Sequence, residues 1–585
     1  MRYFFILLLI LPFLSFAQKF EPIPEKSKPG YQFNLQKNFF PTETDYYKKV
    51  AELSDSLCYI NSLLNNENNA MNEWISIIQQ YSRVEATYRV IDLYLFLRFA
   101  INMNDEKADR ESDSLRNMIR LTRTLIKQKI AAIKVKEADK ITTVAPGLTY
   151  YIKTIRNEKL HILTPAEEKL IEPYRYTRSS GFYDDAFGKM KFEKLKTADG
   201  EIDVLRERSA WENDPDVNIQ KSGSRMLFEG YAGQRDFLGY NYIQFIKGLN
   251  ANAVSRNYEG LINEKLNSWM LPANSLQSFF DNIIKGAKEN SEKDSTTKTT
   301  APAPMRFTIQ EATGKIEKAL SVLGKDYKIE VANLLDPQQG RIDLFGDGNR
   351  IPIRGTASVY PVFPSIFYAL NYEGYMIDLT LLAHEIGHAV QASLMYKNEV
   401  PMIYATGPAY FTESFGKFNE LLLFDFLCTN EKDNIKRKVY ANELKNKIDV
   451  LYGSTHEAYI EYSLVKGILY GNIKTPNDLD SFTVKAGAAI FPGLYKEQPE
   501  HKGLWMIMET NFREPLHNIN DMIAAALAIK YYQLYKSDKV NFIARYLTLL
   551  KEGYHDSPPN LLKSFGIDIR DENFIKSVVE FVVQY

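Results

Sequence analysis

The 585-residue sequence predicts a large, mainly α-helical fold, with two helical lobes and a small β-sheet beside one central helix. Three observations favour this fold. Residues 42–284 show helical spacing of apolar residues, whereas residues 341–372 are rich in the β-branched and aromatic residues typical of strands. The chain also exceeds the usual length of a single domain. No fixed-period repeat is present, which argues against a solenoid.

Residues 1–17 predict a secretory signal peptide. Arg2 precedes a mostly apolar run, and the small residue Ala17 marks the expected cleavage site. This run is too short to cross a bilayer core of roughly 30 Å, and no other stretch approaches the required length. We therefore expect a secreted or periplasmic protein with no integral membrane segment once the signal peptide is removed.

The rest of the chain is expected to form an N-terminal helical lobe over residues 18–284 and a second lobe over residues 305–585. Residues 285–304 are rich in Lys, Ser, Thr and Pro, which predicts a flexible linker or insertion. The formal net charge of −1 gives no argument for a nucleic-acid partner, and we expect a monomer. Cys58 and Cys428 are the only cysteines, and nothing in their spacing indicates a disulfide.

The central helix is predicted over residues 380–397 and contains the pattern H-E-x-x-H. A helix turns by about 100° per residue, so His384 and His388 share one face and can bind one metal ion. Glu385 lies beside them and can accept a proton. This arrangement is typical of a zinc site with two ligands and a general base. A chance match is the alternative, and the small number of histidines, seven in the chain, argues against it.

A catalytic zinc site needs a third protein ligand, for which Glu413 is the candidate. It lies 25 residues beyond His388, in a segment whose apolar residues recur with helical spacing. Taken alone, Glu413 would be interpreted as a solvated surface residue. Its position on a predicted helix that can pair with the H-E-x-x-H helix favours a ligand instead. Glu420 lies two helical turns further on and is a candidate to orient one of the ligands.

These residues resemble the thimet oligopeptidase and oligoendopeptidase F family of zinc metallopeptidases. The resemblance rests on H-E-x-G-H, on the following E-S-x-x-x-x-N-E, and on the approach N-Y-x-G-x-x-x-D at residues 371–378. It covers roughly residues 200–585. It implies a zincin-type fold with a deep substrate channel between two helical lobes, Zn²⁺ as cofactor and short peptides as substrates. Asp378, which ends the approach, is a second candidate to support the metal ligands.

The strand-like residues 367–372 are expected to provide an exposed edge beside the metal helix. Such an edge can bind an extended peptide through its backbone, which makes Tyr368, Asn371 and Tyr372 candidate substrate-binding residues. A buried strand with no free edge is the alternative.

One segment departs from the family pattern. The resemblance implies W-x-x-x-x-H followed by P-F-Y-x-x-x-Y, but Thr510, His517 and Asp521 occupy the expected histidine and tyrosine positions. His517 is a candidate oxyanion donor, which as an imidazolium would act better at mildly acidic pH. Alternatively, His517 and Asp521 are ordinary polar residues, or a tyrosine further along acts instead (Tyr531, Tyr532 or Tyr535).

The predicted function is therefore a secreted zinc metallo-oligopeptidase that hydrolyses internal bonds of short peptides. Zinc lowers the pKa of water toward neutrality, and Glu385 accepts the proton and passes it to the departing amine. Two alternatives are a peptide-binding pseudopeptidase with little turnover, favoured by the replaced donors, and a zinc exopeptidase. A dipeptidase or carboxypeptidase would need a basic residue for a terminal carboxylate, and Arg513 could provide it.

Overall fold

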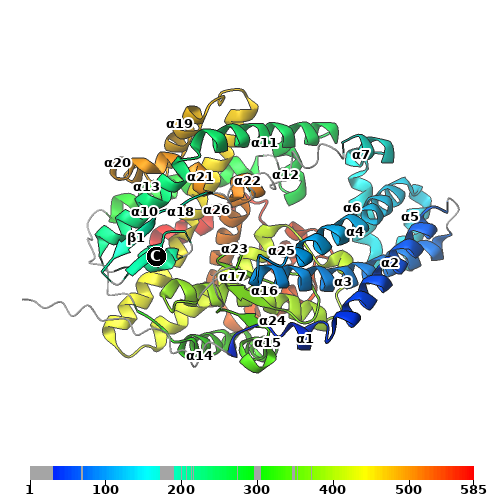
Figure 1. Cartoon of the computed structure of the whole chain (residues 1–585), viewed down its shortest axis with the longest axis horizontal. Coiled ribbons are helices and arrows are strands. Elements are labelled where there is room, and N and C mark those ends of the chain that lie inside the picture. The colour runs from blue at the N-terminus through cyan, green and yellow to red at the C-terminus, as the bar shows by residue number, and fades with distance from the viewer. Residues whose placement is uncertain are drawn as a thin grey trace, which may run out of the picture.

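A computed structural model of the chain shows a mainly α-helical molecule with a small sheet beside the central helix, as the sequence predicts, and a two-stranded hairpin that was not predicted (Figure 1). The structure describes residues 30–66, 70–171, 183, 190–198, 200–205, 207–212, 214, 216–272, 274–294, 305–345, 350–351, 353–369 and 372–585. The predicted signal peptide, residues 1–17, and residues 295–304 of the predicted linker lie outside these ranges.

A first group of helices forms an N-terminal lobe with its own hydrophobic core, the blue-to-cyan part of Figure 1. These helices are α2 (Glu43–Leu64), α3 (Met71–Ile101), α4 (Glu106–Ala132), α5 (Val135–Val144) and α6 (Thr149–Asn157), preceded by α1 (Leu35–Asn38) and followed by α7 (Pro165–Ile171). The buried apolar residues of this lobe run from Phe40 to Ile155. They recur at helical spacing, so each helix turns one apolar stripe inward.

The helices that follow surround a second, larger core. They are α9 (Arg208–Glu212), α10 (Val217–Ala232), α11 (Arg235–Ser255), α12 (Leu261–Trp269), α13 (Ser275–Asp294), α14 (Ile309–Leu320), α15 (Lys325–Leu335), α16 (Met376–Lys397), α17 (Ala409–Asn430), α18 (Asn434–Leu469), α19 (Pro476–Gly487), α20 (Leu494–Glu497), α21 (Leu504–Ile507), α22 (Thr510–Arg513), α23 (Asn518–Ser537), α24 (Lys539–Lys551), α25 (Pro558–Phe565) and α26 (Glu572–Gln584).

The boundary between the two cores corrects the expected division of the chain. Helix α11 and the first half of α13 lie before residue 284, yet these helices pack against α18 and α26 in the second core. Among the described residues, the smaller core ends at Ile155 in α6, and the buried apolar residues of α10–α13 belong to the larger core. Helix α13 also continues to Asp294, so the first half of the predicted linker is helical.

Helices α16 and α17 cross at the centre of the molecule (Figure 1). α16 is apolar on nearly all sides, which suits a helix surrounded by protein. Asn419 on α17 donates from Nδ2 to the carbonyl oxygen of Ala383 on α16 at 3.0 Å. At the crossing, a Cβ placed on Gly387 would lie 3.0 Å from the Cα of Gly416. Only glycine allows the two backbones to approach so closely.

Two small sheets accompany the helices. β1 (Lys194–Thr197) and β2 (Gly200–Asp203) form an antiparallel hairpin, and the second sheet has the strand order β3-β5-β4. In that sheet β5 (Phe367–Ala369) runs parallel to β3 (Ile342–Asp343) and antiparallel to β4 (Gly355–Ala357). The expectation of a free edge at residues 367–372 is therefore wrong, because β5 is the middle strand. β4 is an outer strand and packs beside α16.

Two of the hydrogen bonds that join the N-terminal lobe to the larger lobe involve the segments before β4 and α17. The backbone N–H of Ile351 donates to the carbonyl oxygen of Ala100, at the end of α3, at 2.9 Å. Tyr404, in the 3₁₀ turn Met402–Tyr404 before α17, donates from its hydroxyl to the carbonyl oxygen of Gly147 at 2.6 Å. These contacts tie the lobe to the segment that enters β4 and to the segment that enters α17.

Within the described part of the chain, no helix combines the length and apolar character needed to cross a membrane. Cys58 is exposed on α2 and Cys428 is partly buried on α17, and both are free thiols.

Candidate metal centre and catalytic site

The H-E-x-x-H residues lie in the middle of α16, where helical spacing brings His384 and His388 to one face. The helix is fixed at its N-terminus by Asp378, whose carboxylate accepts from the backbone N–H of Tyr375 at 2.9 Å and of Glu373 at 3.1 Å. Asp378 thus acts as a helix cap, and its hydrogen bonds go to the backbone before α16. Its expected role beside the ligands is corrected to one of fixing the helix.

Glu413 comes from α17 and meets the two histidines where the helices cross. His384 Nε2 lies 3.1 Å from Glu413 Oε2, and His388 Nε2 lies 3.2 Å from His384 Nε2 and 3.6 Å from Glu413 Oε2. One ligand atom from each of the three residues lies within 4.8 Å of the others. Lone pairs at this separation repel one another unless a positive charge lies between them. The donor set therefore fits a cation that accepts nitrogen and oxygen ligands, such as Zn²⁺.

Glu420 lies behind His384, as its spacing predicts. Since an ionised carboxylate only accepts, His384 Nδ1 carries the proton and donates to Glu420 Oε1 at 2.7 Å. This bond leaves His384 Nε2 directed at Glu413 and His388. Lys447 on α18 lies 3.0 Å from the second oxygen of Glu420. The pair Lys447–Glu420 therefore fixes the orientation of the imidazole from outside the ligand set.

The electrostatics of the cluster favour positive charge at its centre. Burial raises the pKa of Glu420, but Lys447 and His384 outweigh it and lower that pKa to about 2. Burial lowers the pKa of His384, yet hydrogen bonds to Glu413 and Glu420 raise it to about 10. Both pKa shifts reflect the negative charge of two carboxylates that face the imidazole nitrogens of His384. A metal cation would gain from this negative charge in place of the proton.

Glu385 is almost fully buried on the same helix turn as His384. Burial raises the pKa of its carboxyl group, although the two neighbouring histidines oppose the shift. The outer strand β4 lies next to it, since a Cβ on Gly355 would come within 3.1 Å of Glu385 Oε1. A carboxylate with a raised pKa, beside an outer strand and the ligand cluster, can accept and return a proton.

Glycine at position 416 allows the ligand geometry. A Cβ on Gly416 would lie 2.7 Å from Cε1 and 2.8 Å from Nε2 of His384, so any side chain there would displace the imidazole. Gly416 is not part of the motifs that predict the site. Gly416 could have been found from its position three residues after Glu413, because this helix must pass close to a histidine.

Comparisons with known proteins agree with this architecture. No protein-family model matches the chain. The oligoendopeptidase F homolog of Borreliella burgdorferi is 22% identical over 458 residues, which cover 73% of this chain and 75% of that protein. The oligoendopeptidase F homolog of Lactococcus lactis subsp. lactis is 24% identical over 279 residues, 47% of this chain and 45% of that protein.

Solved structures extend the likeness to nearly the whole fold. Oligoendopeptidase-F from Enterococcus faecium aligns with a TM-score of 0.67 and 17% identity over 93% of this chain and 97% of that one. The chain is thus similar to oligoendopeptidase F proteins in sequence and in fold. PZ peptidase A, solved with an inhibitor, aligns with a TM-score of 0.70 and 15% identity over 92% of this chain and 96% of that one.

In this oligoendopeptidase F relative, the three residues at the expected donor positions have local partners. Thr510 Oγ1 accepts from Asn518 Nδ2 at 3.0 Å, so Thr510 joins α22 to α23. Asp521 Oδ1 lies 3.4 Å from Nζ of Lys417 on α17. His517, at the start of α23, lies with Nδ1 3.2 Å from Glu514 Oε2.

His517 belongs to the electrostatic environment of the ligand cluster. Burial lowers its pKa, but Glu514, Asp521 and Glu413 outweigh this effect and raise the pKa to about 9. The expectation that His517 needs a mildly acidic pH to be an imidazolium is therefore corrected, because the surrounding carboxylates keep it protonated at neutral pH. The influence of Glu413 places His517 near the metal-ligand candidates.

The predicted substrate-binding tyrosines are core residues. Tyr368 and Tyr372 are buried, and their hydroxyls donate to the carbonyl oxygens of Ile351 and Phe307, each at 2.9 Å. Both bind their own chain and cannot present a hydroxyl to a peptide in this arrangement. Asn371 lies outside the described residues.

The tyrosines considered as substitute donors are also buried. Tyr531 packs among the aromatic rings of the larger core, and Tyr532 donates to Asp425 at 2.7 Å. Tyr535 is 7% exposed and contacts Phe418 and Phe542. These positions face the core because α23 turns its apolar side toward α17, and the helical spacing of α23 could have indicated it.

Two partly buried lysines near the site were not predicted. Lys417 lies one helical turn beyond Glu413, and the carboxylates of Asp521, Glu420 and Glu413 raise its pKa although burial opposes the shift. Its spacing from Glu413 could have indicated that both side chains lie on the same face of α17. Lys447, which contacts Glu420, lies on α18 and is close only through the tertiary fold.

Proposed function

We propose that this protein is a zinc-dependent oligopeptidase that hydrolyses internal bonds of short peptides. The observation that carries the proposal is the convergence of His384, His388 and Glu413 within 4.8 Å, with Glu385 beside them and Glu420 behind His384. The oligoendopeptidase F relatives support the same class of substrate. The metal would be held by His384, His388 and Glu413.

Zinc, when bound, supplies Lewis-acid chemistry that polarises a peptide carbonyl and makes water more acidic. The protein residues provide the proton transfers. Glu385 accepts a proton from the attacking water and then delivers it to the nitrogen of the departing amine. The raised pKa of Glu385 suits both steps, because the group must hold the proton briefly near neutral pH.

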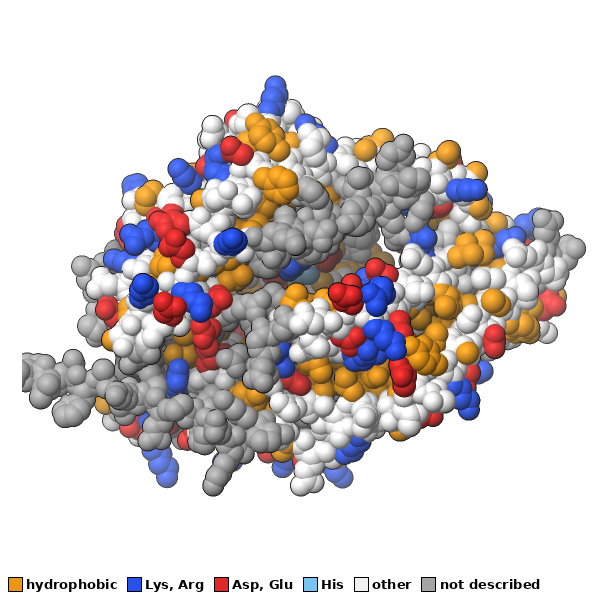
Figure 2. Space-filling model, in the orientation of Figure 1, with side chains coloured by type: hydrophobic (Ala, Val, Ile, Leu, Met, Phe, Trp, Pro, Cys, Tyr) orange, Lys and Arg blue, Asp and Glu red, His pale blue; other side chains and the backbone are white. Residues whose placement is uncertain are grey.

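The peptide is proposed to lie along β4. This strand pairs with β5 on one side only, and its first residue, Gly355, is the close neighbour of Glu385 described above. An extended peptide can therefore add to the free side of β4 and present a bond to Glu385. Figure 2 shows a hollow across the middle of one face, with histidine atoms visible inside it. Such a recess would admit extended peptides more readily than folded proteins.

His517 is proposed as the donor that stabilises the tetrahedral oxyanion. As an imidazolium it carries a positive charge and donates through an N–H group, where a tyrosine at the same position would donate through its O–H. Its raised pKa keeps this charge present at neutral pH. Residues 1–17 further lead us to propose that the enzyme is secreted or periplasmic.

A pseudopeptidase that binds peptides with little turnover is the second candidate. The observation in its favour is that Thr510, His517 and Asp521 replace the expected histidine and tyrosines. An exopeptidase gains less support, because the Arg513 guanidinium donates to Glu509 on the same helical turn instead of being held ready for a terminal carboxylate.

The test is digestion of a mixed peptide library by the full-length mature protein, read by mass spectrometry. Three samples are compared: zinc-loaded protein, protein treated with a chelator, and chelator-treated protein given zinc again. We expect internal cleavage in the first and third samples only. Cleavage that persists without metal would contradict the zinc mechanism. Removal of terminal residues alone would indicate an exopeptidase, and stoichiometric zinc binding without cleavage would indicate the pseudopeptidase.

A further inference from the structure

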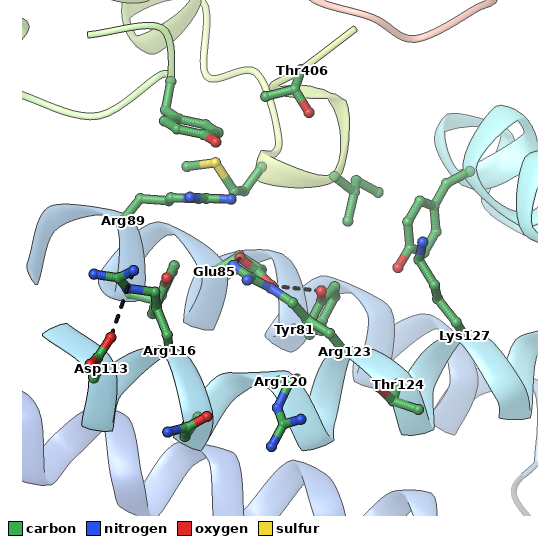
Figure 3. A pocket seen from close by; sticks show the side chains of 16 residues that line it. Tyr81, Glu85, Arg89, Asp113, Arg116, Arg120, Arg123, Thr124, Lys127 and Thr406 are labelled. Carbon is green, nitrogen blue, oxygen red and sulfur yellow. Dashed lines mark hydrogen bonds and ion pairs between the residues drawn. The ribbon is translucent and has the colours of Figure 1, made fainter. Parts of the chain in front are cut away.

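A large cavity lies away from the metal-ligand candidates, between helices α3 and α4 of the N-terminal lobe and the segment around Met402–Tyr404 (Figure 3). Its volume is about 910 Å³, enough for several amino-acid side chains. None of His384, Glu385, His388 or Glu413 lines it.

Basic side chains dominate the lining of this cavity. Five of the lining residues are cationic and two are acidic (Arg89, Arg116, Arg120, Arg123 and Lys127; Glu85 and Asp113). Figure 3 shows most of the basic groups along α4, with Arg89 from α3 opposite them. The cavity therefore has an excess of positive charge, although the chain as a whole has a net charge of −1.

One of the two carboxylates is already neutralised inside the protein. Glu85 accepts from Nε and Nη2 of Arg123 at 2.6 and 2.7 Å, and from the Tyr81 hydroxyl at 2.6 Å. Such a two-point pair is rigid and leaves the carboxylate little capacity to bind another cation. Removing Arg123 would leave the buried Glu85 without its ion-pair partner, so this pair is a fixed part of the cavity lining.

The remaining carboxylate is weakly engaged. Asp113 lies 3.8 Å from Arg116, and both side chains are more than half exposed. Lys127 is exposed, and among the described residues it has no hydrogen-bond or ion-pair partner. Arg116 donates from Nη2 to the Ser112 hydroxyl at 2.8 Å and has no close ion pair within the described part of the chain. Arg116 and Lys127 can therefore contact an incoming anion without breaking a strong ion pair in the protein.

The cavity lies beyond the C-terminal end of β4, the strand with an unpaired outer edge. Tyr360, one of its lining residues, follows the end of β4 at Ala357 by three residues, a span of roughly 10 Å in extended chain. The Arg89 guanidinium stacks on the Tyr360 ring at 3.9 Å and holds this wall in place. On the other side, Thr406 lies in the segment that enters α17, seven residues before Glu413.

We propose that this cavity is a binding subsite for carboxylate side chains, and that it selects acidic peptides for the catalytic centre. The inference rests on the proposed peptidase function, since it assumes a peptide that extends along β4 past the bond to be cut. Aspartate or glutamate a few residues from that bond would enter the cavity and contact Arg116 and Lys127. The excess positive charge would disfavour basic residues at the same place.

The test measures binding separately from turnover. It uses the Glu385→Gln variant of the full mature protein and two fluorescent hexapeptides of the same sequence, one with two glutamates and one with glutamines in their place. Arg116→Gln with Lys127→Gln removes two charges from the cavity. The matched control, Lys136→Gln with Lys140→Gln, removes two charges from α5 outside the cavity.

We expect the acidic peptide to bind about tenfold more tightly than the glutamine peptide, with a preference that falls as salt is added. The cavity variant should reduce the preference to within about twofold, whereas the α5 control should keep it. Thermal denaturation of both variants establishes that each is folded. If a double variant fails to fold, Lys127→Gln alone takes its place.

Equal binding of the two peptides, or an unchanged preference in the folded cavity variant, would overturn the proposal. The same peptides are then offered to the wild-type enzyme. If the preference depends on the cavity but no zinc-dependent hydrolysis occurs, the subsite stands and the proposed peptidase activity fails. If hydrolysis occurs with no charge preference in binding, the peptidase stands and the subsite fails.

Discussion

The two sides of the catalytic centre differ in how much of the family pattern they keep. On the metal side, the three ligand candidates, the general-base candidate and the supporting Glu420 come from two crossing helices and contact one another directly. On the donor side, Thr510, His517 and Asp521 stand where the family pattern has a histidine and tyrosines, and each contacts a local neighbour. Metal binding and oxyanion stabilisation can therefore change independently in this fold.

The largest expected effect tests whether the metal side is catalytic. Glu385→Gln should lower kcat/KM by about 10²- to 10⁴-fold, because an amide cannot accept the proton of the attacking water. Zinc content should stay at one per protein, since Glu385 is not among the ligand candidates. Peptide hydrolysis and metal analysis check the two parts. Glu399→Gln, at an exposed position just after α16, is the control and should keep full activity.

Replacement of His517 tests whether the donor side still contributes to catalysis. His517→Gln should lower kcat by about 10²- to 10³-fold with little change in KM, the cost of losing one oxyanion donor. His555→Gln removes an exposed histidine and serves as the control. A loss no greater than that of the control would mean that the donor side has been released from catalysis.

The pH profile sharpens the same comparison. His517 has a pKa of about 9, so it is charged at lower pH and loses its charge as the pH rises through that value. A metal cation bound by Glu413 would disfavour the charged imidazolium and so lower the pKa of His517. Wild-type kcat should therefore decline at or somewhat below about pH 9. His517→Gln should lack this alkaline limb. An unchanged limb in the variant would assign it to another group.

Glu420 tests how far the metal side depends on residues behind the ligands. Glu420→Gln should weaken zinc binding by about 10- to 100-fold, because the hydrogen bond that orients His384 loses its charge. Competition with a chromophoric chelator measures the affinity. Lys417→Gln changes a charge in the same region without touching a ligand candidate, and should alter zinc affinity less than Glu420→Gln does.

The smallest effect is expected at β4. Gly355→Ala places a methyl group within 2.9 Å of a flexible Leu381 methyl and 3.1 Å of Glu385 Oε1, so the base must shift by a few tenths of an ångström. A displacement of this size should lower kcat by less than about tenfold. Gly314→Ala, whose added methyl meets nothing within 4 Å, is the control. Equal kinetics in the two variants would place the substrate away from β4.

The helical fold and the ligand set were predictable because local patterns encode them. Helical spacing alone brings His384 and His388 together, and the segment around Glu413 has a clear helical period. The middle position of β5 was not predictable, since pairing with β3 and β4 depends on residues far along the chain. The pKa of His517 was missed for the same reason, because Glu413, one of its neighbours, lies on another helix.

The contacts that join the N-terminal lobe to the rest of the molecule link its position to the reaction geometry. The Ala100–Ile351 bond holds the segment entering β4, and the Gly147–Tyr404 bond holds the segment entering α17. A rigid rotation of the lobe would therefore move the segment before β4 and the start of α17 together. The width of the cleft and the distances between the metal-ligand candidates would then change together. A peptide that draws the lobe inward would also shorten those distances.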